Sequence, residues 1–167
     1  DIFLAGKPIS LLNLLRITPM LFAAYYFGSR KRSFGIVVPL IAIALFLLHP
    51  VGKQVWFFSL FWTVPLIAKT LPSKYATSIV ARSLGATFTA HAVGGVLWTY
   101  TVPMTPETYM ALIPVVIMER TLFAAGIAAS YVAVNAILDK ALETFDMAAP
   151  AGLLYIEKRF TFRATRA

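Results

Sequence analysis

The sequence predicts an all-α membrane protein, built as a polytopic bundle of five transmembrane helices. Of its 167 residues, 59% are hydrophobic and only 13% are charged, and the mean hydropathy is +0.78. A soluble domain typically has about 25% charged residues. The apolar residues also gather in long runs separated by short polar clusters, whereas the strands of a membrane β-barrel alternate in polarity at every residue. Both observations favour helices in lipid.

Five runs have the length, or nearly the length, to cross a bilayer, for which a helix needs roughly 20 apolar residues. The first run contains Arg16, the second carries no charge, and the third is short and rich in aromatic residues. The fourth run contains Arg82 and His91, and the fifth has Glu119 and Arg120 at its middle. Turn residues and basic clusters separate the runs, which cover residues 9–29, 33–50, 54–69, 75–101 and 107–138.

Lysine and arginine residues predict the orientation of the bundle. With five crossings, ten of them fall on the side that holds the C-terminus and two on the other side. Positive residues concentrate in cytoplasmic loops, so the C-terminus of a multi-pass protein of the cell membrane is expected in the cytoplasm. Splitting the fifth run into two crossings would put the basic tail outside, which favours one long tilted or bent helix, or a partial outer helix that runs into it. The predicted domains are a transmembrane bundle, 1–143, and a basic cytoplasmic tail, 144–167, which lies on the lipid surface or docks to a partner subunit.

Ionisable side chains within the apolar runs are the candidate functional residues, because a charge in the bilayer core is costly and normally faces the protein interior or a cavity. His91 lies nine residues before Tyr100, and Glu119 lies twelve residues after Glu107, so both have comparable depths on consecutive antiparallel helices. A contact between His91 and Glu119 is expected, with Arg120 completing it or competing for it. Three roles are open for such a contact: it could line a polar ligand pocket, hold two helices in register, or relay protons.

A concave strip is predicted beside His91. Trp98 follows His91 by two helical turns and shares its face, and Gly94 and Gly95 remove side-chain bulk between them. A polar floor with an aromatic wall is the usual lining of a small-molecule pocket. The aromatic residues near the run ends are otherwise expected in the interfacial belt, namely Trp56, Trp62, Trp98, Tyr100 and Tyr109.

Small residues repeat every four positions on three runs, a spacing that lets helix backbones approach closely. On the fourth and fifth runs the expected contact lies within the chain. On the first run a contact with another subunit is nearly as strongly favoured. The positions assigned to helix contacts are Ala24, Gly28, Ala86, Ala90, Ala125 and Ala129.

The motifs that the sequence lacks exclude several kinds of chemistry. Cysteine is absent and His49 and His91 are the only histidines, so no metal site is predicted. No GxSxG nucleophile motif, P-loop or dinucleotide-binding glycine pattern occurs. The chain is therefore expected to be no enzyme and to hold no cofactor. Its net charge of +8 is expected to mark the cytoplasmic side of the membrane and not a nucleic-acid partner.

Two stretches resemble the substrate-binding S components of energy-coupling factor (ECF) transporters. One runs from Asn13 through Thr18-Pro19 and an apolar helix to Gly28 and a basic turn, and the other surrounds Ala90-His91-Ala92-Val93-Gly94-Gly95. The likeness covers roughly residues 13–135 and includes Glu119-Arg120. It implies a helical bundle, normally of six spans, that captures a vitamin, an amino acid or a similar solute from outside. The first of the five runs resembles the second span of that family, and the sequence starts at Asp1, so a further span is expected upstream of it.

The resemblance also implies partners and a solute site. The expected partners are the lipid bilayer, the solute, a transmembrane coupling subunit and two ATPases. The alternative is a non-catalytic accessory subunit of a larger membrane enzyme or respiratory complex, in which His91 and Glu119 would form a dry pair. The resemblance carries the pocket role to Thr18, His91, Trp98, Glu119 and Arg120, and Gly94 and Gly95 complete the predicted site.

Overall fold

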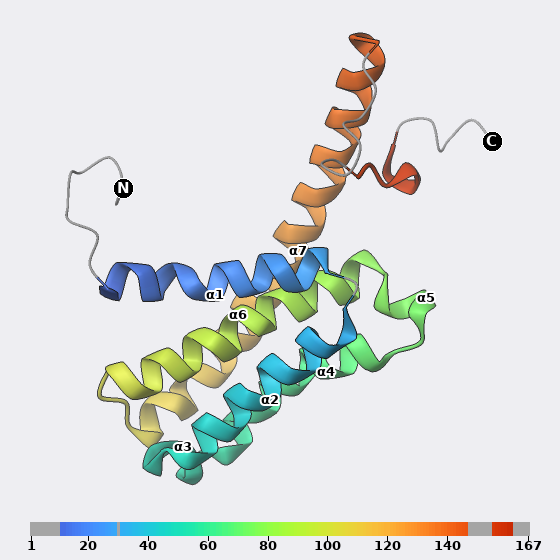
Figure 1. Cartoon of the computed structure of the whole chain (residues 1–167). Coiled ribbons are helices and arrows are strands. Elements are labelled where there is room, and N and C mark those ends of the chain that lie inside the picture. The colour runs from blue at the N-terminus through green and yellow to red at the C-terminus, as the bar shows by residue number, and fades with distance from the viewer. Residues whose placement is uncertain (1–10, 30, 147–154, 162–167) are drawn as a thin grey trace. The chain divides into compact units, whose positions relative to one another are not determined.

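A computed structural model describes residues 11–29, 31–146 and 155–161 of the chain (Figure 1). Helices are the only regular secondary structure in these ranges, which confirms the predicted all-α class. The chain divides into two compact units, Asp1–Ala124 and Ala125–Ala167. The elements are α1 (Leu11–Gly28), α2 (Arg32–Leu48), α3 (Pro50–Gln54), the 3₁₀ helix η1 (Trp56–Trp62), α4 (Thr63–Thr70), α5 (Ser73–Ala76), α6 (Ile79–Thr101), α7 (Pro106–Thr144) and the 3₁₀ helix η2 (Lys158–Phe160).

Four of the five apolar runs form one principal helix each. The first, second and fourth runs correspond to α1, α2 and α6, and the short helix α5 precedes α6. The fifth run forms α7, a single helix of 39 residues that continues through Pro114 without a break. The sequence therefore predicts correctly that this run is not divided into two helices.

The third run does not form the single helix that its composition predicts. It begins in the short helix α3, continues as the seven-residue 3₁₀ helix η1 and ends as α4. In η1 the hydroxyl of Ser59 donates a hydrogen bond to the carbonyl oxygen of Trp56, at 2.7 Å. The side chains of Phe58 and Trp62 are buried while Trp56 is exposed. Almost every residue of this segment is apolar, so its sequence does not show which side of a helix would face the core. The tighter 3₁₀ turn places the bulky rings of Phe58 and Trp62 in the core.

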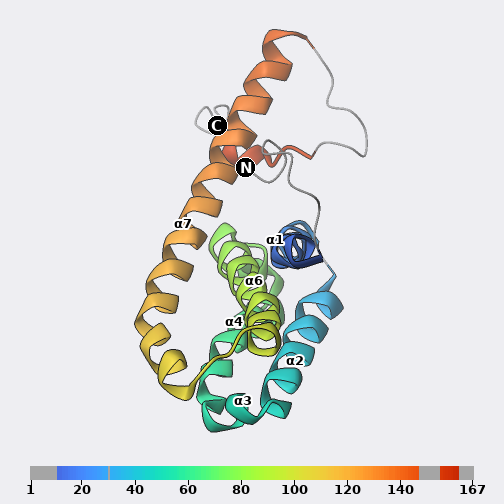
Figure 2. The same ribbon diagram turned by 90° about the vertical axis from the view of Figure 1, so that its left-hand side faces the viewer.

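In the first unit, α6 is the central helix. It packs against α1, α2 and α4, and Figures 1 and 2 show it lying between α2 and the first half of α7. A core of aromatic and aliphatic side chains fills the end of the unit where α3 lies. Its fully buried members include Phe46, Phe58, Trp62, Ala92 and Tyr109.

Tyr26 is the side chain on which four helices meet. It is 1% exposed, and its hydroxyl donates a hydrogen bond to the carbonyl oxygen of Pro65 on α4, at 2.9 Å. A Cβ atom on Gly85 of α6 would overlap the Tyr26 ring, and one on Gly35 of α2 would lie 2.9 Å from the ring. Glycine is therefore required at both positions for the helices to pack around this ring.

Two cations from other helices bind the C-terminal end of α1. The Nζ atom of Lys69 donates hydrogen bonds to the carbonyl oxygens of Tyr26 and Ser29, at 3.3 and 2.7 Å. The Nε atom of Arg82 donates to the carbonyl oxygen of Phe27, at 3.1 Å. The last carbonyls of a helix have no partner within it and carry partial negative charge, so both contacts stabilise this end. They explain how Lys69 is buried within an apolar unit.

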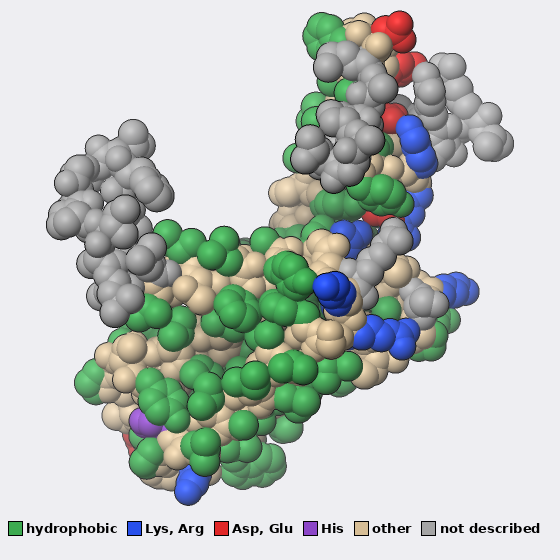
Figure 3. Space-filling view, viewed as in Figure 1, with side chains coloured by type: hydrophobic (Ala, Val, Ile, Leu, Met, Phe, Trp, Pro, Cys, Tyr) green, Lys and Arg blue, Asp and Glu red, His purple; other side chains and the backbone are tan. Residues whose placement is uncertain are grey.

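The surface of the first unit is apolar over much of its area. Figure 3 shows hydrophobic side chains covering the face that α1 and α2 present, with Lys and Arg gathered mainly at the end where α5 lies. Buried positions of α6 in turn hold hydroxyl side chains, among them Ser83, Thr87 and Thr89. Exposed apolar side chains occur on several helices, for example Met20 and Leu21 on α1, Leu40, Ile41 and Leu48 on α2, Ile67 on α4, Val80 on α6, and Met118 and Leu122 on α7.

Among the described helices, one has both the length and the composition of a membrane span. This helix is α7, whose most apolar window has a mean hydropathy of 1.8 and is 11% buried. The helix α2 is also apolar but has only 17 residues. The structure thus offers one candidate span, which suggests membrane association, and the five-span bundle stays a prediction.

The small-residue stripes differ in burial. On α6, Ala86 and Ala90 are buried, in agreement with the expected role in helix packing. On α1, Ala24 is exposed and a Cβ on Gly28 would meet nothing within 4 Å. The remaining stripe, with Ala125 and Ala129, is exposed in the second unit. The contacts expected for these two exposed stripes stay predictions.

The second unit consists of the end of α7 and a returning segment, residues 155–161. The side chain of Asn135, 5% exposed, holds this segment through its two polar groups. Its Nδ2 atom donates to the carbonyl oxygens of Glu157 and Phe160, at 3.0 and 3.3 Å, and its Oδ1 atom accepts from the Glu157 amide at 2.7 Å. The Tyr131 hydroxyl donates to the Glu157 carboxylate at 2.9 Å, and Lys158 pairs with Asp139 at 3.1 Å.

These contacts bear on the predicted tail, 144–167. Its described part, 155–161, binds α7 of its own chain, and residues 147–154 and 162–167 lie outside the described residues. The boundary between the two compact units falls inside α7, after Ala124, and the predicted division at residue 143 stays a prediction. The assignment of the tail to the cytoplasm stays a prediction.

The Asn135→Ala variant should release the returning segment. It removes three hydrogen bonds, each worth about 1 kcal/mol, so the segment should open about 3 kcal/mol more easily. Amide hydrogen exchange of residues 155–161 should accelerate by roughly 100-fold, while exchange in α6 stays unchanged. The Ser130→Ala variant, at an exposed position of the same helix, is the control. Unchanged protection in Asn135→Ala would show that the charged pairs alone hold the segment.

Candidate functional site

A cavity of about 460 Å³ opens at the surface of the first unit. Its volume falls in the range of 300–1,000 Å³ that is typical of small-molecule sites. The side chains of η1, α6 and the first half of α7 line it, with Met104 from the connection between the last two. The lining residues are Phe58, Ala90, His91, Gly94, Gly95, Trp98, Met104, Thr108, Tyr109, Leu112 and Arg120.

A hydrogen bond fixes the protonation of His91. The indole Nε1–H of Trp62 donates to Nδ1 of His91, at 3.1 Å. An indole nitrogen only donates, so Nδ1 must carry no proton. The imidazole is therefore neutral and bears its single proton on Nε2, which makes that nitrogen a hydrogen-bond donor. Trp62 thus determines what His91 offers to a ligand.

Aromatic rings enclose His91. The ring centroids of Phe58, Phe61, Trp62 and Phe88 lie 5.6 to 6.3 Å from the imidazole centroid. Trp62 reaches this position because α6 has a glycine beneath it, since a Cβ on Gly95 would lie 2.7 Å from Cζ2 of Trp62. The absence of a side chain at Gly95 therefore also leaves the space that Trp62 needs to contact His91.

The expected contact between His91 and Glu119 does not form. Glu119 instead pairs with its neighbour, with 3.0 Å between its Oε2 atom and Nη2 of Arg120, and its side chain is 44% exposed. Two residues at the same depth on neighbouring helices need not point toward each other. Of Glu119 and Arg120, only Arg120 lines the cavity, and its side chain is 16% exposed.

Arg120 has further donor capacity at this place. Its guanidinium lies 4.8 Å from the centroid of the Phe123 ring. Its Nε–H is buried without a hydrogen-bond partner among the described residues. A buried donor without an acceptor is costly, so the described residues leave the Arg120 guanidinium incompletely satisfied.

Another part of the lining comes from Thr108 and Tyr109, at the start of α7. The hydroxyl groups of Tyr109 and Thr99 are 2.6 Å apart and satisfy each other. The buried ring of Tyr109 packs edge-on against Phe58, with centroids 4.9 Å apart. Thr108 is exposed at the cavity, with its hydroxyl 3.1 Å from that of Thr105. The ring of Tyr109 therefore acts as an apolar wall of fixed orientation.

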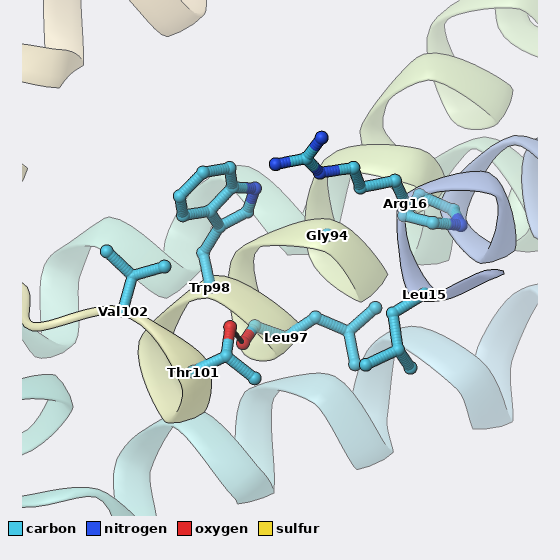
Figure 4. Close-up of a pocket in the computed structure, with 8 residues that line it drawn as sticks. Leu15, Arg16, Gly94, Leu97, Trp98, Thr101 and Val102 are labelled. Carbon is cyan, nitrogen blue, oxygen red and sulfur yellow. Dashed lines mark hydrogen bonds between the residues drawn. The ribbon is translucent and has the colours of Figure 1, made fainter. Parts of the chain in front are cut away.

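A second cavity, of about 280 Å³, shares Gly94 and Trp98 with the first. It lies between α1 and α6, and Figure 4 shows Arg16 extending its guanidinium toward the indole of Trp98. The other residues that line it are Leu15, Pro19, Leu97, Thr101 and Val102. Trp98, 53% exposed, thus borders two cavities, each of which contains one arginine.

The structure brings most of the predicted site residues to one place. His91, Gly94, Gly95, Trp98 and Arg120 all line the larger cavity. The two others, Glu119 and Thr18, line neither of the two cavities described above.

Sequence reasoning misplaced two aromatic residues. Trp62 and Tyr109 are expected in the interfacial belt, but they are 0% and 2% exposed and belong to the core. Trp56, Trp98 and Tyr100 are exposed, as residues of such a belt would be. Composition alone gives no signal that separates these two groups. The role of Trp62 becomes evident only when Gly95 and His91 are seen next to it.

Two further observations concern identity. In the described ranges, no group of three or more His, Asp or Glu residues is arranged to hold a metal ion. No protein family matches the sequence, and neither a curated protein nor a solved structure shows significant similarity to it. The resemblance to ECF S components therefore stays a prediction, and the function must be argued from the cavity.

Proposed function

We propose that this chain is an integral membrane subunit that binds a small organic solute and has no catalytic activity of its own. The observation that carries the proposal is the cavity at His91 and Arg120, which has the volume of a small-molecule site. It combines a few oriented polar groups with apolar and aromatic walls, which is the usual composition of such sites. As an importer subunit, the chain would capture its solute from the outer side and would act with a coupling subunit and ATPases.

The surface supports a membrane location for the first unit. Large apolar side chains are exposed on several helices, and extensive exposed apolar patches mark contact with a membrane or a partner. The cations Lys31, Arg32 and Lys74 are exposed at the end where α5 lies, and Lys53 lies at the other end. A five-span, multi-pass arrangement in the cell membrane would place the first group in the cytoplasm.

Two lengths fit this arrangement. Although η1 and α4 are short separately, together they extend about 26 Å because a 3₁₀ helix rises about 2 Å per residue. The helix α7 extends about 58 Å, twice the thickness of the hydrocarbon layer. With a single crossing by α7, the five-span arrangement would put the C-terminus in the cytoplasm.

The accessory-subunit alternative predicts a dry pair of His91 and Glu119. The hydrogen bond of His91 to Trp62, and the pairing of Glu119 with Arg120, favour the solute-binding subunit instead. In this arrangement His91 and Arg120 line an open cavity.

Filling the cavity should abolish solute binding. The Thr108→Trp variant would place an indole in the mouth of the cavity, and the exposed position should tolerate it. The purified protein, incubated with a small-molecule extract of its source cells, is examined by native mass spectrometry. The wild type should retain a bound molecule of a few hundred daltons, and Thr108→Trp should retain none.

The Thr121→Trp variant is the matched control, because Thr121 is exposed on the same helix and lines neither cavity. It should bind as the wild type does. Wild-type protein that retains no small molecule, or equal retention in both tryptophan variants, would contradict the proposal. Stable association with a catalytic subunit in the absence of any bound molecule would favour the accessory role.

A further inference from the structure

We infer that the solute carries a carboxylate group attached to a flat apolar or aromatic body. The inference rests on the proposed function and specifies the chemical class of molecule that the larger cavity accepts. It follows from three properties of the lining: its hydrogen-bonding groups are mainly donors, Arg120 is among them, and aromatic rings form its walls.

The polar groups of the lining are predominantly donors. His91 offers Nε2–H, because Trp62 occupies Nδ1, and Arg120 offers guanidinium N–H groups. Thr108 adds a hydroxyl, which can donate or accept. Neither aspartate nor glutamate is among the residues that line this cavity. A ligand that matches this set presents acceptor atoms, and a cationic amine would meet no carboxylate in the lining.

Arg120 favours a charged acceptor over a neutral one. Among the described residues its salt-bridge partner is Glu119, which pairs with Nη2 and whose side chain is 44% exposed and therefore partly solvated. The buried Nε–H has no acceptor among the described residues. A guanidinium binds a carboxylate through two parallel hydrogen bonds, and these charge-assisted bonds are about twice as strong as neutral ones. The carboxylate of the solute would therefore bind here, with Nε2–H of His91 as an additional donor.

The remaining walls suit a flat body. Phe58 and Tyr109 hold each other edge-on, and Trp98 borders the cavity from α6. Aromatic faces bind flat apolar groups by stacked or edge-on contacts. A volume of about 460 Å³ is sufficient for a ring system with a short side chain.

The test compares three probes of the same shape and different charge, which are 3-phenylpropionate, 3-phenylpropionamide and 3-phenylpropylamine. Binding to the full chain in lipid nanodiscs is measured by titration calorimetry. The carboxylate should bind at least tenfold more tightly than the amide, and the amine should not bind. The Arg120→Gln variant should weaken carboxylate binding by about 10- to 100-fold and remove the preference over the amide. Arg120→Lys, which keeps the charge but loses the two-pronged geometry, should fall between.

Arg16→Gln is the control, because Arg16 is a second arginine near Trp98 that lines only the smaller cavity. It should leave the three affinities unchanged. Binding of the amide or the amine that is as tight as that of the carboxylate, or tighter, would overturn the inferred class. So would loss of the preference for the carboxylate in Arg16→Gln while Arg120→Gln keeps it. Failure of all three probes would also overturn it. The proposed function is decided separately by the extract experiment, in which the bound molecule need not be an anion.

Discussion

The Gly85→Ala variant should unfold at a temperature roughly 10 °C lower than the wild type, with a loss of about 3 kcal/mol in unfolding free energy. The added methyl group would overlap the ring of Tyr26, which is fully buried between α1, α2, α4 and α6. The ring has no space to move, and displacing it would break the hydrogen bond from its hydroxyl to Pro65. This loss exceeds the gain of about 1 kcal/mol that alanine gives over glycine in a helix. Thermal unfolding in detergent measures the difference.

The same substitution at an open position provides the control. A Cβ on Gly126 of α7 would meet nothing within 4 Å, so Gly126→Ala should be neutral or slightly stabilising. A double-mutant cycle with Tyr26→Leu isolates the contact, because without the ring the cost of Gly85→Ala should largely disappear. Wild-type stability of Gly85→Ala would mean that α1 and α6 are farther apart than the structure has them.

The sequence predicts the helices of this protein better than the contacts between them. Long apolar runs and turn clusters give α1, α2, α6 and the undivided α7 to within a few residues, since each of these signals is local. The third run misleads because almost every residue of 56–62 is apolar, so nothing in the pattern separates a 3₁₀ turn from an α-helix. A helix boundary needs only neighbouring residues, whereas a packing partner comes from elsewhere in the chain.

The candidate site shows the same division. Periodicity along α6 correctly joins His91, Gly94, Gly95 and Trp98 to one cavity, because all four lie on one helix. The contact that equal depth predicted between His91 and Glu119 does not form. Depth gives the position of a residue along the helix axis but not the direction in which its side chain points. Trp62, which orients His91, lies 29 residues away on an irregular segment, and no spacing rule connects the two.

Trp62 should therefore be the residue whose replacement affects both folding and binding. It is completely buried against Phe46, with ring centroids 5.0 Å apart, and Gly95 has no side chain to fill the space that it occupies. Trp62→Ala should cost about 3–5 kcal/mol of stability through the cavity that it creates. Trp62→Phe keeps an aromatic ring and should fold, but it removes the N–H that donates to Nδ1 of His91.

The expected consequence in Trp62→Phe is a change of histidine tautomer. Nitrogen-15 NMR of labelled histidine should show His91 protonated on Nε2 in the wild type and a mixture of both tautomers in the variant. Only one other histidine is present, so His49→Gln assigns the signals. Solute affinity should fall about tenfold, because the donor toward the cavity is then only partly populated and less well oriented. Trp56→Phe replaces an exposed tryptophan of the same 3₁₀ helix and should change neither property. If Trp62→Phe keeps both the tautomer and the affinity, Trp62 serves the core alone and His91 is oriented by its aromatic surroundings.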